Sequence, residues 1–554
     1  MALVDGILFA LLAAVLVFWW VPALPSRQLI LFLCAGGLIA FGLYGALNDR
    51  WQAGICAGFG LLLITLTTLM VLRGGLPKSL PYISGPIITL FAALPAFALY
   101  SFPIGNIPAP SGPYSVGMRT FELSDETRPG LFGVEANAPR RLLVRVWYPA
   151  QVPTGAKPAP YFSAAEAKTT ARAFGEFMKF PPLMTYLKHV KTNAYPNAPL
   201  ANGITQLPPI LFSHGALSRL NQSTFLMEDL ASHGYGVYSV QHVGESAHTV
   251  FPNGDVIAID QGLLEFAKTS KEAKGDYKDA IIKGMGAEAL DDRLAGQLDW
   301  LSRRKRDDSR IHSGQYVWLE DRIFVLDQLE AGHVPAEIAD IAAKSDFAQS
   351  GHMGMSFGGA IAGMHCAADP RCVAGINIDG ALVQRPVMDK AVNGAFMVFT
   401  SDHDLFYKSM MGKGNYAPDL KQRHWVFDFS YERFGSAGER ADIHRIELNR
   451  TAHMGLTDYP LFLRGPIAQA MLGKAPADII LGAQKDFIRS FFNTYMRGED
   501  SGFPAAQLAE YADYTESRKA QHIRAWWLSK SSNEQGDIRR AIAGDETSGS
   551  LNQQ

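Results

Sequence analysis

Four apolar runs, each close to the length that spans a lipid bilayer, occupy the first 102 residues of the chain. None of them contains Asp, Glu, Lys or Arg, and they cover residues 7–24, 29–47, 52–71 and 83–102. A helix needs about 20 such residues to cross the hydrocarbon core. A buried helical subdomain is the alternative, but four uncharged runs in series are rare in soluble cores. The sequence therefore predicts an all-α transmembrane domain of four helices over residues 1–104, with membrane lipid as a partner.

Charges between these runs predict how the chain is oriented. Arg27, Arg73 and Lys78 fall on one side of the four spans, whereas Arg50 falls on the other side with both termini. Cytoplasmic loops carry the excess of Lys and Arg, so the large C-terminal part is expected on the extracytoplasmic side. The start of the chain lacks the positive segment of a signal peptide, so the first apolar run is expected to remain uncleaved as part of the membrane anchor. We expect an integral membrane protein of a bacterial inner or plasma membrane.

The composition excludes several classes of protein. The 51 Lys and Arg residues nearly balance the 53 Asp and Glu residues, so the basic surface that binds nucleic acid is not expected. Hydrophobic residues make up 48% of the chain, which is enough to build a core and excludes disorder as the main state. No zinc spacing of the His-Glu-x-x-His type and no phosphate-binding Gly-x-x-x-x-Gly-Lys loop occurs, so no metal or organic cofactor is predicted.

After a linker rich in Pro and Gly at residues 103–113, short strand-like segments alternate with helical ones. The strand candidates cover residues 141–148, 209–213, 236–240, 347–353, 373–378, 395–400 and 443–448, and the first has the composition of an edge strand. Strands separated by helices predict a mostly parallel sheet covered on both faces. We expect this α/β domain to span residues 105–530, with a flexible polar tail at 531–554. A helical insertion at 263–320 is expected either to cover the site as a lid or to decorate the fold.

Residues 354–358 read Gly-Met-Ser-Phe-Gly, the pattern of a nucleophile elbow. Such an elbow places its serine, here Ser356, on a sharp turn from a strand to a helix. A Gly-rich turn that holds a serine by chance is the alternative, and the partners of the serine decide between the two. An α/β-hydrolase triad runs in the order serine, acid, histidine. The candidate acids after Ser356 are Asp379, Asp402 and Asp404, and the candidate bases are His403, His444 and His453.

The chemistry needs these three groups and an oxyanion hole. A histidine takes the proton of the serine, and a carboxylate fixes the tautomer of the histidine and stabilises its positive charge. Two backbone N–H groups bind the negative oxygen of the intermediate. One belongs to the residue after the nucleophile, Phe357, and the second is expected from Ala216, in the loop after the strand at 209–213. Since Asp379 and Asp402 both follow a strand, the residues alone leave the acid open.

Stretches spread along the chain share one family pattern. They are residues 112–117, 146–149, 212–215, 230–235, 241–242, 322–327 and 354–359, with Asn377 to Gly380 and His453 to Asp458 further on. Together they resemble the plasma and type II platelet-activating-factor acetylhydrolases of the α/β-hydrolase superfamily, over roughly residues 108–497. The resemblance implies an α/β-hydrolase fold with Ser356 as nucleophile, Asp379 as acid and His453 as base. Asp402 is kept as the reserve acid.

Two positions depart from the family pattern. The family usually carries His before the nucleophilic serine, where this chain has Met355, and a bulky aromatic residue after the acid, where it has Gly380-Ala381-Leu382. We therefore expect a wider acyl pocket, and the reaction class carries over more safely than a preference for acetyl groups. Cys366 and Cys372 either pair in an oxidising compartment or serve only in packing.

These features predict a membrane-anchored serine carboxylic-ester hydrolase that acts on lipid or other small apolar esters through an acyl-enzyme. An envelope acyltransferase is an alternative, because it uses the same triad and the same acyl-enzyme. A membrane sensor or scaffold with an inactive hydrolase fold is a third hypothesis. The intact order of Ser356, Asp379 and His453 argues against it.

Overall fold

The computed structural model describes the chain apart from residues 25, 75–78, 131–137, 179–183, 272–273, 308, 381–390, 403, 406–439, 519–520 and 544–554. The chain forms two compact units. The first comprises Met1–Ile107, Pro160–Thr192 and Pro460–Ala470, and the second comprises Pro108–Ala159, Asn193–Tyr459 and Met471–Gln554.

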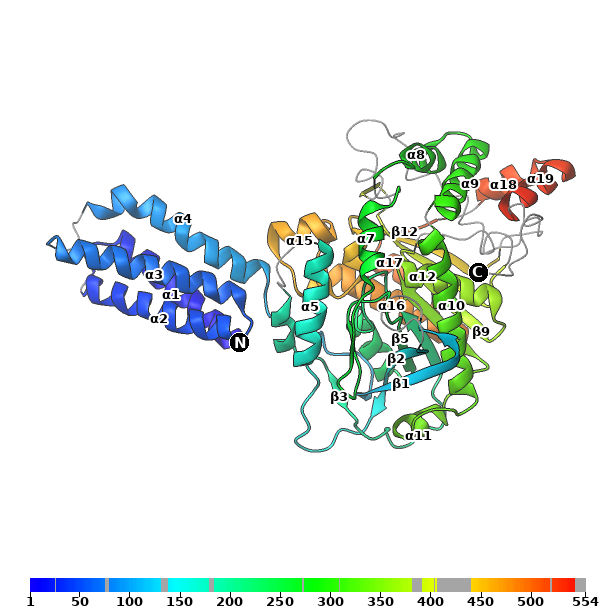
Figure 1. The fold of residues 1–554 in the computed structure, drawn as a ribbon, viewed down its shortest axis with the longest axis horizontal. Coiled ribbons are helices and arrows are strands. Elements are labelled where there is room, and N and C mark those ends of the chain that lie inside the picture. Colours follow the sequence, from blue (N-terminus) through cyan, green and yellow to red (C-terminus); the bar gives the residue numbers. More distant parts are fainter. Residues whose placement is uncertain are drawn as a thin grey trace. The chain divides into compact units, whose positions relative to one another are not determined.

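Four long apolar helices lie side by side in the first unit (Figure 1). They are α1 (Ala2–Trp20), α2 (Arg27–Leu47), α3 (Trp51–Leu72) and α4 (Leu80–Ser101). Each contains a stretch long and apolar enough to cross a membrane, so the four predicted helices are confirmed. Small residues let α2 and α3 approach closely, since a Cβ on Gly45 would lie 2.4 Å from the Cβ of Ala53.

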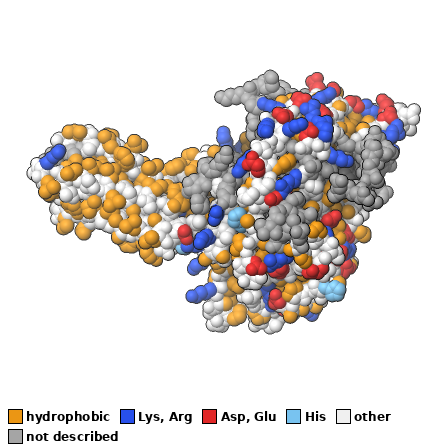
Figure 2. Space-filling model, in the orientation of Figure 1, with side chains coloured by type: hydrophobic (Ala, Val, Ile, Leu, Met, Phe, Trp, Pro, Cys, Tyr) orange, Lys and Arg blue, Asp and Glu red, His pale blue; other side chains and the backbone are white. Residues whose placement is uncertain are grey.

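The outer surface of these four helices is apolar. Figure 2 shows hydrophobic side chains over their visible face, with few charged side chains among them. Leu29, Leu72 and Leu90 expose 60%, 78% and 72% of their surface. Monomeric soluble proteins rarely expose a continuous apolar surface of this extent.

One ion pair is buried inside this helical bundle. The Nη2 atom of Arg50 lies 2.7 Å from Oδ2 of Asp5, and the Arg50 side chain has no exposed surface. Arg50 also donates a hydrogen bond of 2.7 Å to the carbonyl of Phe102, and its guanidinium lies 4.9 Å from the centre of the Tyr186 ring. A buried charge needs such partners, because its removal from water is costly.

Shorter elements complete the first unit. They are α5 (Ala164–Met178), the 3-10 helix η2 (Thr185–His189) and, at the edge of the unit, η7 (Tyr459–Leu461) and α15 (Gly465–Leu472). Helix η2 contacts the turn between α2 and α3. Its His189 donates from Nε2 to the carbonyl of Asn48 at 2.7 Å, and Lys188 forms an ion pair with Asp49.

A ten-stranded sheet forms the centre of the second unit, in the order β12-β11-β10-β9-β8-β4-β5-β2-β1-β3. Its strands are β1 (Ser115–Pro129), β2 (Pro139–Ala150), β3 (Ala194–Pro196), β4 (Pro209–Ser213), β5 (Gly236–Gln241), β8 (Ser350–Met355), β9 (Cys372–Ile378), β10 (Ala395–Ser401), β11 (Ile443–Leu448) and β12 (Thr515–Ser517). The run from β5 to β11 is parallel throughout, which confirms the predicted α/β class.

The prediction that residues 141–148 form an edge strand is wrong. Strand β2 pairs with β1 on one side and with β5 on the other, antiparallel in both cases. Branched and aromatic residues favour a strand. They do not report its place in a sheet, and the strands β1 and β3 continue the sheet beyond β2.

Helices cover both faces of this sheet, as adjacent residues of β8 indicate. A Cβ on Gly351 would lie 2.7 Å from the Met496 sulfur in α16 (Ala477–Arg497), whereas the ring of His352 lies 4.1 Å from that of His365 in α12 (Phe357–Ala368). Neighbouring residues of a strand point to opposite faces. Helix α16 therefore lies on one face and α12 on the other, where α10 (Ser309–Glu330) packs beside it (Figure 1).

The remaining elements include three helices where the sequence predicts an insertion. They are α7 (Gln261–Thr269), α8 (Lys278–Gly286) and α9 (Leu290–Asp307). The others are α6 (Thr224–Ser232), the hairpin β6 (Thr249–Val250) and β7 (Val256–Ile257), η3 (Ala336–Ile338), α11 (Ala339–Ala342), η6 (His453–Leu456), α17 (Ala505–Glu510), α18 (Gln521–Leu528) and α19 (Ser532–Ala543).

The predicted flexible tail begins with a helix instead. The Ser531 hydroxyl accepts a hydrogen bond from the N–H of Glu534 at 3.3 Å, and the Glu534 carboxylate accepts one from the N–H of Ser531 at 2.8 Å. This reciprocal capping box satisfies N–H groups at the start of a helix and favours α19 in a polar sequence.

Candidate active site

Ser356 lies on the sharp turn between β8 and α12. It adopts φ +56°, a conformation that is rare for residues with a side chain. The turn also needs glycine on either side, because a Cβ on Gly354 would lie 2.2 Å from the Gly358 carbonyl oxygen. A Cβ on Gly358 would lie 2.2 Å from the carbonyl oxygen of Ser213. These contacts explain the spacing of the predicted nucleophile elbow.

The structure brings together the three residues predicted as a triad. Asp379 follows β9, and His453 begins η6 shortly after β11. The Nε2 atom of His453 lies 3.0 Å from Oγ of Ser356, and its Nδ1 atom lies 2.6 Å from Oδ2 of Asp379. Ser401 holds the Asp379 carboxylate with its backbone N–H at 2.9 Å and its hydroxyl at 2.6 Å.

The two titratable members of this group shift each other's pKa. Burial by itself lowers the pKa of His453, but the hydrogen bond and negative charge of Asp379 outweigh it, so this pKa is above its usual value. Burial raises the pKa of Asp379, but its hydrogen bonds with His453 and Ser401 outweigh that effect, so this pKa is below its usual value. Asp379 therefore stays ionised and accepts a hydrogen bond from the N–H at Nδ1, which leaves the unprotonated Nε2 of neutral His453 to face the serine.

The other candidates lie elsewhere. The Asp402 carboxylate accepts hydrogen bonds from the backbone N–H groups of Asp404 and Arg450, at 2.9 and 2.7 Å. His444 on β11 contacts the Tyr495 hydroxyl at 2.7 Å. His403, Ala381 and Leu382 lie outside the described residues, as does Lys78 of the orientation argument.

The predicted oxyanion donors flank Ser356. Phe357 is the first residue of α12, so its N–H has no partner within the helix. Ala216 lies in the loop after β4, and a Cβ on the preceding Gly215 would lie 3.2 Å from the Cβ of Ser356. Within the described part of the chain, no acceptor takes a hydrogen bond from the N–H of Ala216 or of Phe357.

A second serine, histidine and aspartate lie in line close by, and the sequence analysis missed them. The Oγ atom of Ser213 lies 3.0 Å from Nε2 of His242, whose Nδ1 lies 2.9 Å from Oδ2 of Asp321. All three residues have no exposed surface, whereas 38% of the His453 side chain is exposed. Arg140 pairs with Asp321 at 2.6 Å, and the His242 ring stacks on Trp318 with centroids 3.8 Å apart. Because these three side chains are fully buried, they belong to the core of the second unit and a substrate cannot reach them.

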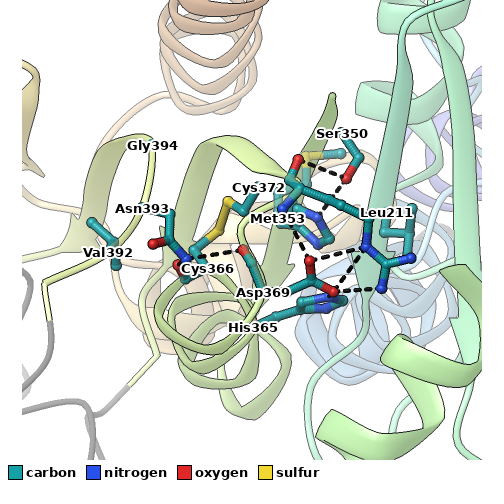
Figure 3. The surroundings of a disulfide bond; sticks show 12 residues. Leu211, Ser350, Met353, His365, Cys366, Asp369, Cys372, Val392, Asn393 and Gly394 are labelled. Carbon is teal, nitrogen blue, oxygen red and sulfur yellow. Dashed lines mark hydrogen bonds and ion pairs between the residues drawn. A yellow bond between two sulfur atoms is a disulfide. The ribbon is translucent and has the colours of Figure 1, made fainter. Parts of the chain in front are cut away.

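A disulfide joins the two elements that carry Ser356 and Asp379. Cys366 near the end of α12 bonds to Cys372 at the start of β9, as Figure 3 shows. The Asn393 side chain donates to the carbonyl of Cys366 at 2.9 Å beside it. The sequence left open whether these cysteines pair or only pack, and in the structure they form a disulfide.

No metal centre accompanies this group of residues in the described part of the chain, where no three His, Cys, Asp or Glu side chains are placed to hold an ion.

Comparison with known proteins agrees with the family pattern of the sequence. The family model described as "Platelet-activating factor acetylhydrolase, isoform II" matches residues 100–277. The predicted resemblance to this family is confirmed. The matched segment contains the loop of Ala216 and ends before Ser356, so it covers only part of the candidate site.

Two further proteins extend the comparison. A probable 1-alkyl-2-acetylglycerophosphocholine esterase of Arthroderma benhamiae is 23% identical over an alignment of 460 positions that covers 77% of this chain and 97% of that protein. A ferulic acid esterase from Streptomyces cinnamoneus shares the fold with a TM-score of 0.53 and 20% identity, over 75% of this chain and 100% of the other. The chain is an esterase of the α/β-hydrolase type that resembles the platelet-activating factor acetylhydrolases.

Proposed function

We propose that this protein is a membrane-anchored serine carboxylic-ester hydrolase that acts on lipid or similarly apolar esters. The observation that carries the proposal is the line from Asp379 through His453 to Ser356, with contacts of 2.6 and 3.0 Å. An acidic orienter, a base and a hydroxyl in this order make an activated nucleophile.

The proposed reaction has two halves. The Ser356 oxygen attacks the ester carbonyl carbon while Nε2 of His453 takes the hydroxyl proton, and the carbonyl oxygen becomes an anion bound by the N–H groups of Ala216 and Phe357. The tetrahedral intermediate collapses, the C–O bond to the alcohol breaks, and protonated His453 gives its proton to the leaving alcohol. Ser356 is then acylated.

Water completes the cycle. His453 takes a proton from a water molecule as its oxygen attacks the acyl carbon, and a second tetrahedral intermediate forms in the same oxyanion hole. Its collapse breaks the bond to the Ser356 oxygen, which regains the proton from His453. The products are a carboxylic acid and the free enzyme. Asp379 remains ionised and stabilises the positive imidazolium in both halves.

Two observations support a substrate that is apolar and reached at a membrane. The relative from Arthroderma benhamiae is named for an ether phospholipid ester. The four helices α1 to α4 are long and apolar enough to anchor the chain in a bilayer. We propose that residues 1–104 form this anchor and that residues 105–530 form the catalytic domain.

The disulfide supports an extracytoplasmic position of the catalytic domain. Disulfides persist in oxidising compartments and are rare in the cytosol. The bond between Cys366 and Cys372 therefore agrees with the orientation that the loop charges favour. Labelling of cysteines or tags introduced on each side of the spans, in intact cells, tests this orientation.

The test of the function uses the full chain in detergent or in lipid nanodiscs. We expect it to hydrolyse p-nitrophenyl esters from acetate to laurate, and Ser356→Ala to lose activity by a factor on the order of 10⁴ or more. A fluorophosphonate probe should label the peptide that contains Ser356 and leave Ser213 unlabelled. Ser490→Ala, a buried serine on α16, is the matched control and should keep the activity.

Each outcome separates the hypotheses. Hydrolysis that survives Ser356→Ala contradicts the proposal. A folded protein that takes no label supports an inactive scaffold. Labelling without hydrolysis, followed by product formation when an alcohol acceptor is added, supports an acyltransferase.

A further inference from the structure

The side chain of Gln222 lies between the loop of Ala216 and the turn of Ser356. Its Oε1 atom accepts a hydrogen bond of 2.6 Å from the N–H of Gly215. Its Nε2 atom lies 3.4 Å from the sulfur of Met355, the residue before Ser356. Gln222 is buried and has 7% of its surface exposed, so water does not readily replace these partners.

The backbone of Gln222 reaches a third segment of the site. Its carbonyl accepts a hydrogen bond of 3.1 Å from the N–H of Asp458, which lies in the segment that starts at His453. The Asp458 carboxylate in turn accepts from the N–H of Thr224 at 2.8 Å, at the start of α6. One residue thus contacts the oxyanion loop, the nucleophile elbow and the histidine segment.

The loop around Gly215 is held from both sides of that residue. Its carbonyl accepts hydrogen bonds from Nδ1 of His214 at 2.7 Å and from the N–H of Ser218 at 3.0 Å. A peptide unit is planar and trans, so its C=O and N–H point in opposite directions. Fixing the Gly215 carbonyl therefore fixes the direction of the Ala216 N–H, the proposed oxyanion donor.

Gln222 fixes the peptide unit before this one, through the N–H of Gly215. Without that acceptor the Gly215 N–H would be buried without a partner, and the loop would have to move to satisfy it. Movement of this loop matters because Gly215 lies close to Ser356. A Cβ added to Gly215 would be only 3.2 Å from the Cβ of Ser356. A shift of the loop would change the distance from the Ala216 N–H to the position of the oxyanion.

We propose that Gln222 is a positioning residue that aligns the Ala216 N–H with the oxyanion formed at Ser356. The inference rests on the proposed function, since it needs a tetrahedral intermediate at that serine. Gln222 itself does not touch the reacting atoms. Its effect is greatest in the transition state, where the negative oxygen forms, and small in the ground-state complex.

The test compares Gln222→Met with wild type in the full chain. Methionine has a similar shape and removes both side-chain hydrogen bonds. We expect kcat per active site, titrated with a fluorophosphonate, to fall about 10–100-fold while KM stays within about twofold. The affinity for a trifluoromethyl ketone, which adds to the serine and places an anionic oxygen in the hole, should fall in parallel with kcat/KM.

A matched control separates positioning from folding. Gln507→Met makes the same change at another buried glutamine, which donates to the Ser490 hydroxyl at 2.9 Å away from the site. It should lower thermal stability while kcat per titrated site stays at the wild-type value. If Gln222→Met does not fold, Gln222→Asn keeps an amide but is one methylene too short to reach, and the same losses are expected.

The outcomes are distinct. Unchanged kcat per titrated site and unchanged ketone affinity overturn the inference, as does a rise in KM alone. Those results leave the proposed function standing as long as Ser356→Ala is inactive. Activity that survives Ser356→Ala overturns the proposed function itself.

Discussion

His453 and Asp379 share a hydrogen bond of 2.6 Å that links two segments 74 residues apart in the chain. The bond has a consequence for the pH dependence of activity. The proposed mechanism needs neutral His453, and Asp379 holds the pKa of this histidine above its usual value. We expect kcat/KM to fall as the pH decreases through a pKa above about 6.5, the usual value for histidine.

Asp379→Asn tests this link. Without the negative charge the pKa of His453 falls, so the acid limb of the pH–rate profile should move to lower pH, and kcat should drop by a factor on the order of 10⁴. Asp402→Asn is the comparison, and its acid limb should stay where the wild type has it. A shift in Asp402→Asn and none in Asp379→Asn would reverse the assignment of the acid.

Four buried histidines predict that the protein loses stability at mildly acidic pH. Burial lowers the pKa of His242 and His365 to about 4, and lowers those of His214 and His352 well below the usual value. An unfolded histidine takes up a proton near pH 6.5, so unfolding binds protons between that pH and about 4. Each group can then remove up to about 1.4 kcal/mol of stability per pH unit over this range.

The measurement is the thermal midpoint from neutral pH down to about pH 5, where the proton uptake on unfolding is large. It should fall as the pH falls, because the four histidines outnumber the two buried carboxyls, Glu228 and Glu245, whose raised pKa values of about 8 and about 7 act in the opposite direction. His352→Gln removes one of the four groups and should make the dependence less steep, whereas His333→Gln, on an exposed residue, should leave the slope as it is. A midpoint that is flat over this range would falsify the prediction.

The bond between Cys366 and Cys372 closes a short loop, so its effect on stability should be modest. The two cysteines are six residues apart, and the loop-closure entropy for such a length corresponds to about 2 kcal/mol. Cys366→Ser with Cys372→Ser, or reduction of the wild type, should lower the thermal midpoint by a few degrees. The double variant Cys34→Ser with Cys56→Ser removes the two free cysteines and is the control. Reductant should lower its thermal midpoint by as much as it lowers that of the wild type.

Because Asp5 and Arg50 form a buried ion pair, we expect the loss of stability caused by replacing Asp5 to be partly reversed when Arg50 is replaced as well. Asp5→Leu leaves the Arg50 charge buried without its carboxylate and should cost about 3–5 kcal/mol, seen as aggregation on size-exclusion chromatography in detergent. Adding Arg50→Leu removes the unpaired charge and should restore much of the monodisperse protein. Arg73→Leu, at an exposed position, should have little effect. A double variant worse than Asp5→Leu alone contradicts this account.

The sequence allowed the site to be predicted where its signals are local. Ser356 sits in a five-residue pattern whose glycines are required by contacts across a single turn. Residues 443–448 were predicted as a strand and form β11. The chain order alone could not decide between Asp379 and Asp402, since both follow a strand. The resemblance to a family favoured Asp379, and the structure places it beside His453.

Signals that depend on distant parts of the chain were missed. Ser213, His242 and Asp321 meet through sequence separations of 29 and 79 residues, and no short motif marks them. The inner position of β2 depends on which strands continue the sheet, which its own residues do not encode. Gln222 lies outside the stretches that carry the family resemblance, and its place depends on a hydrogen bond from the Gly215 N–H that no local sequence signal marks.

The division of the chain into two units has a consequence for how such a protein can change over time. The chain passes from one unit to the other at residues 107, 159, 192, 459 and 470. A single recombination event in the gene cannot exchange one unit for another, because three separate stretches of sequence build each of them. An exchange of residues 1–107 alone would replace the four apolar helices and leave residues 160–192 and 460–470 of the same unit facing new partners, so these three stretches are expected to change together.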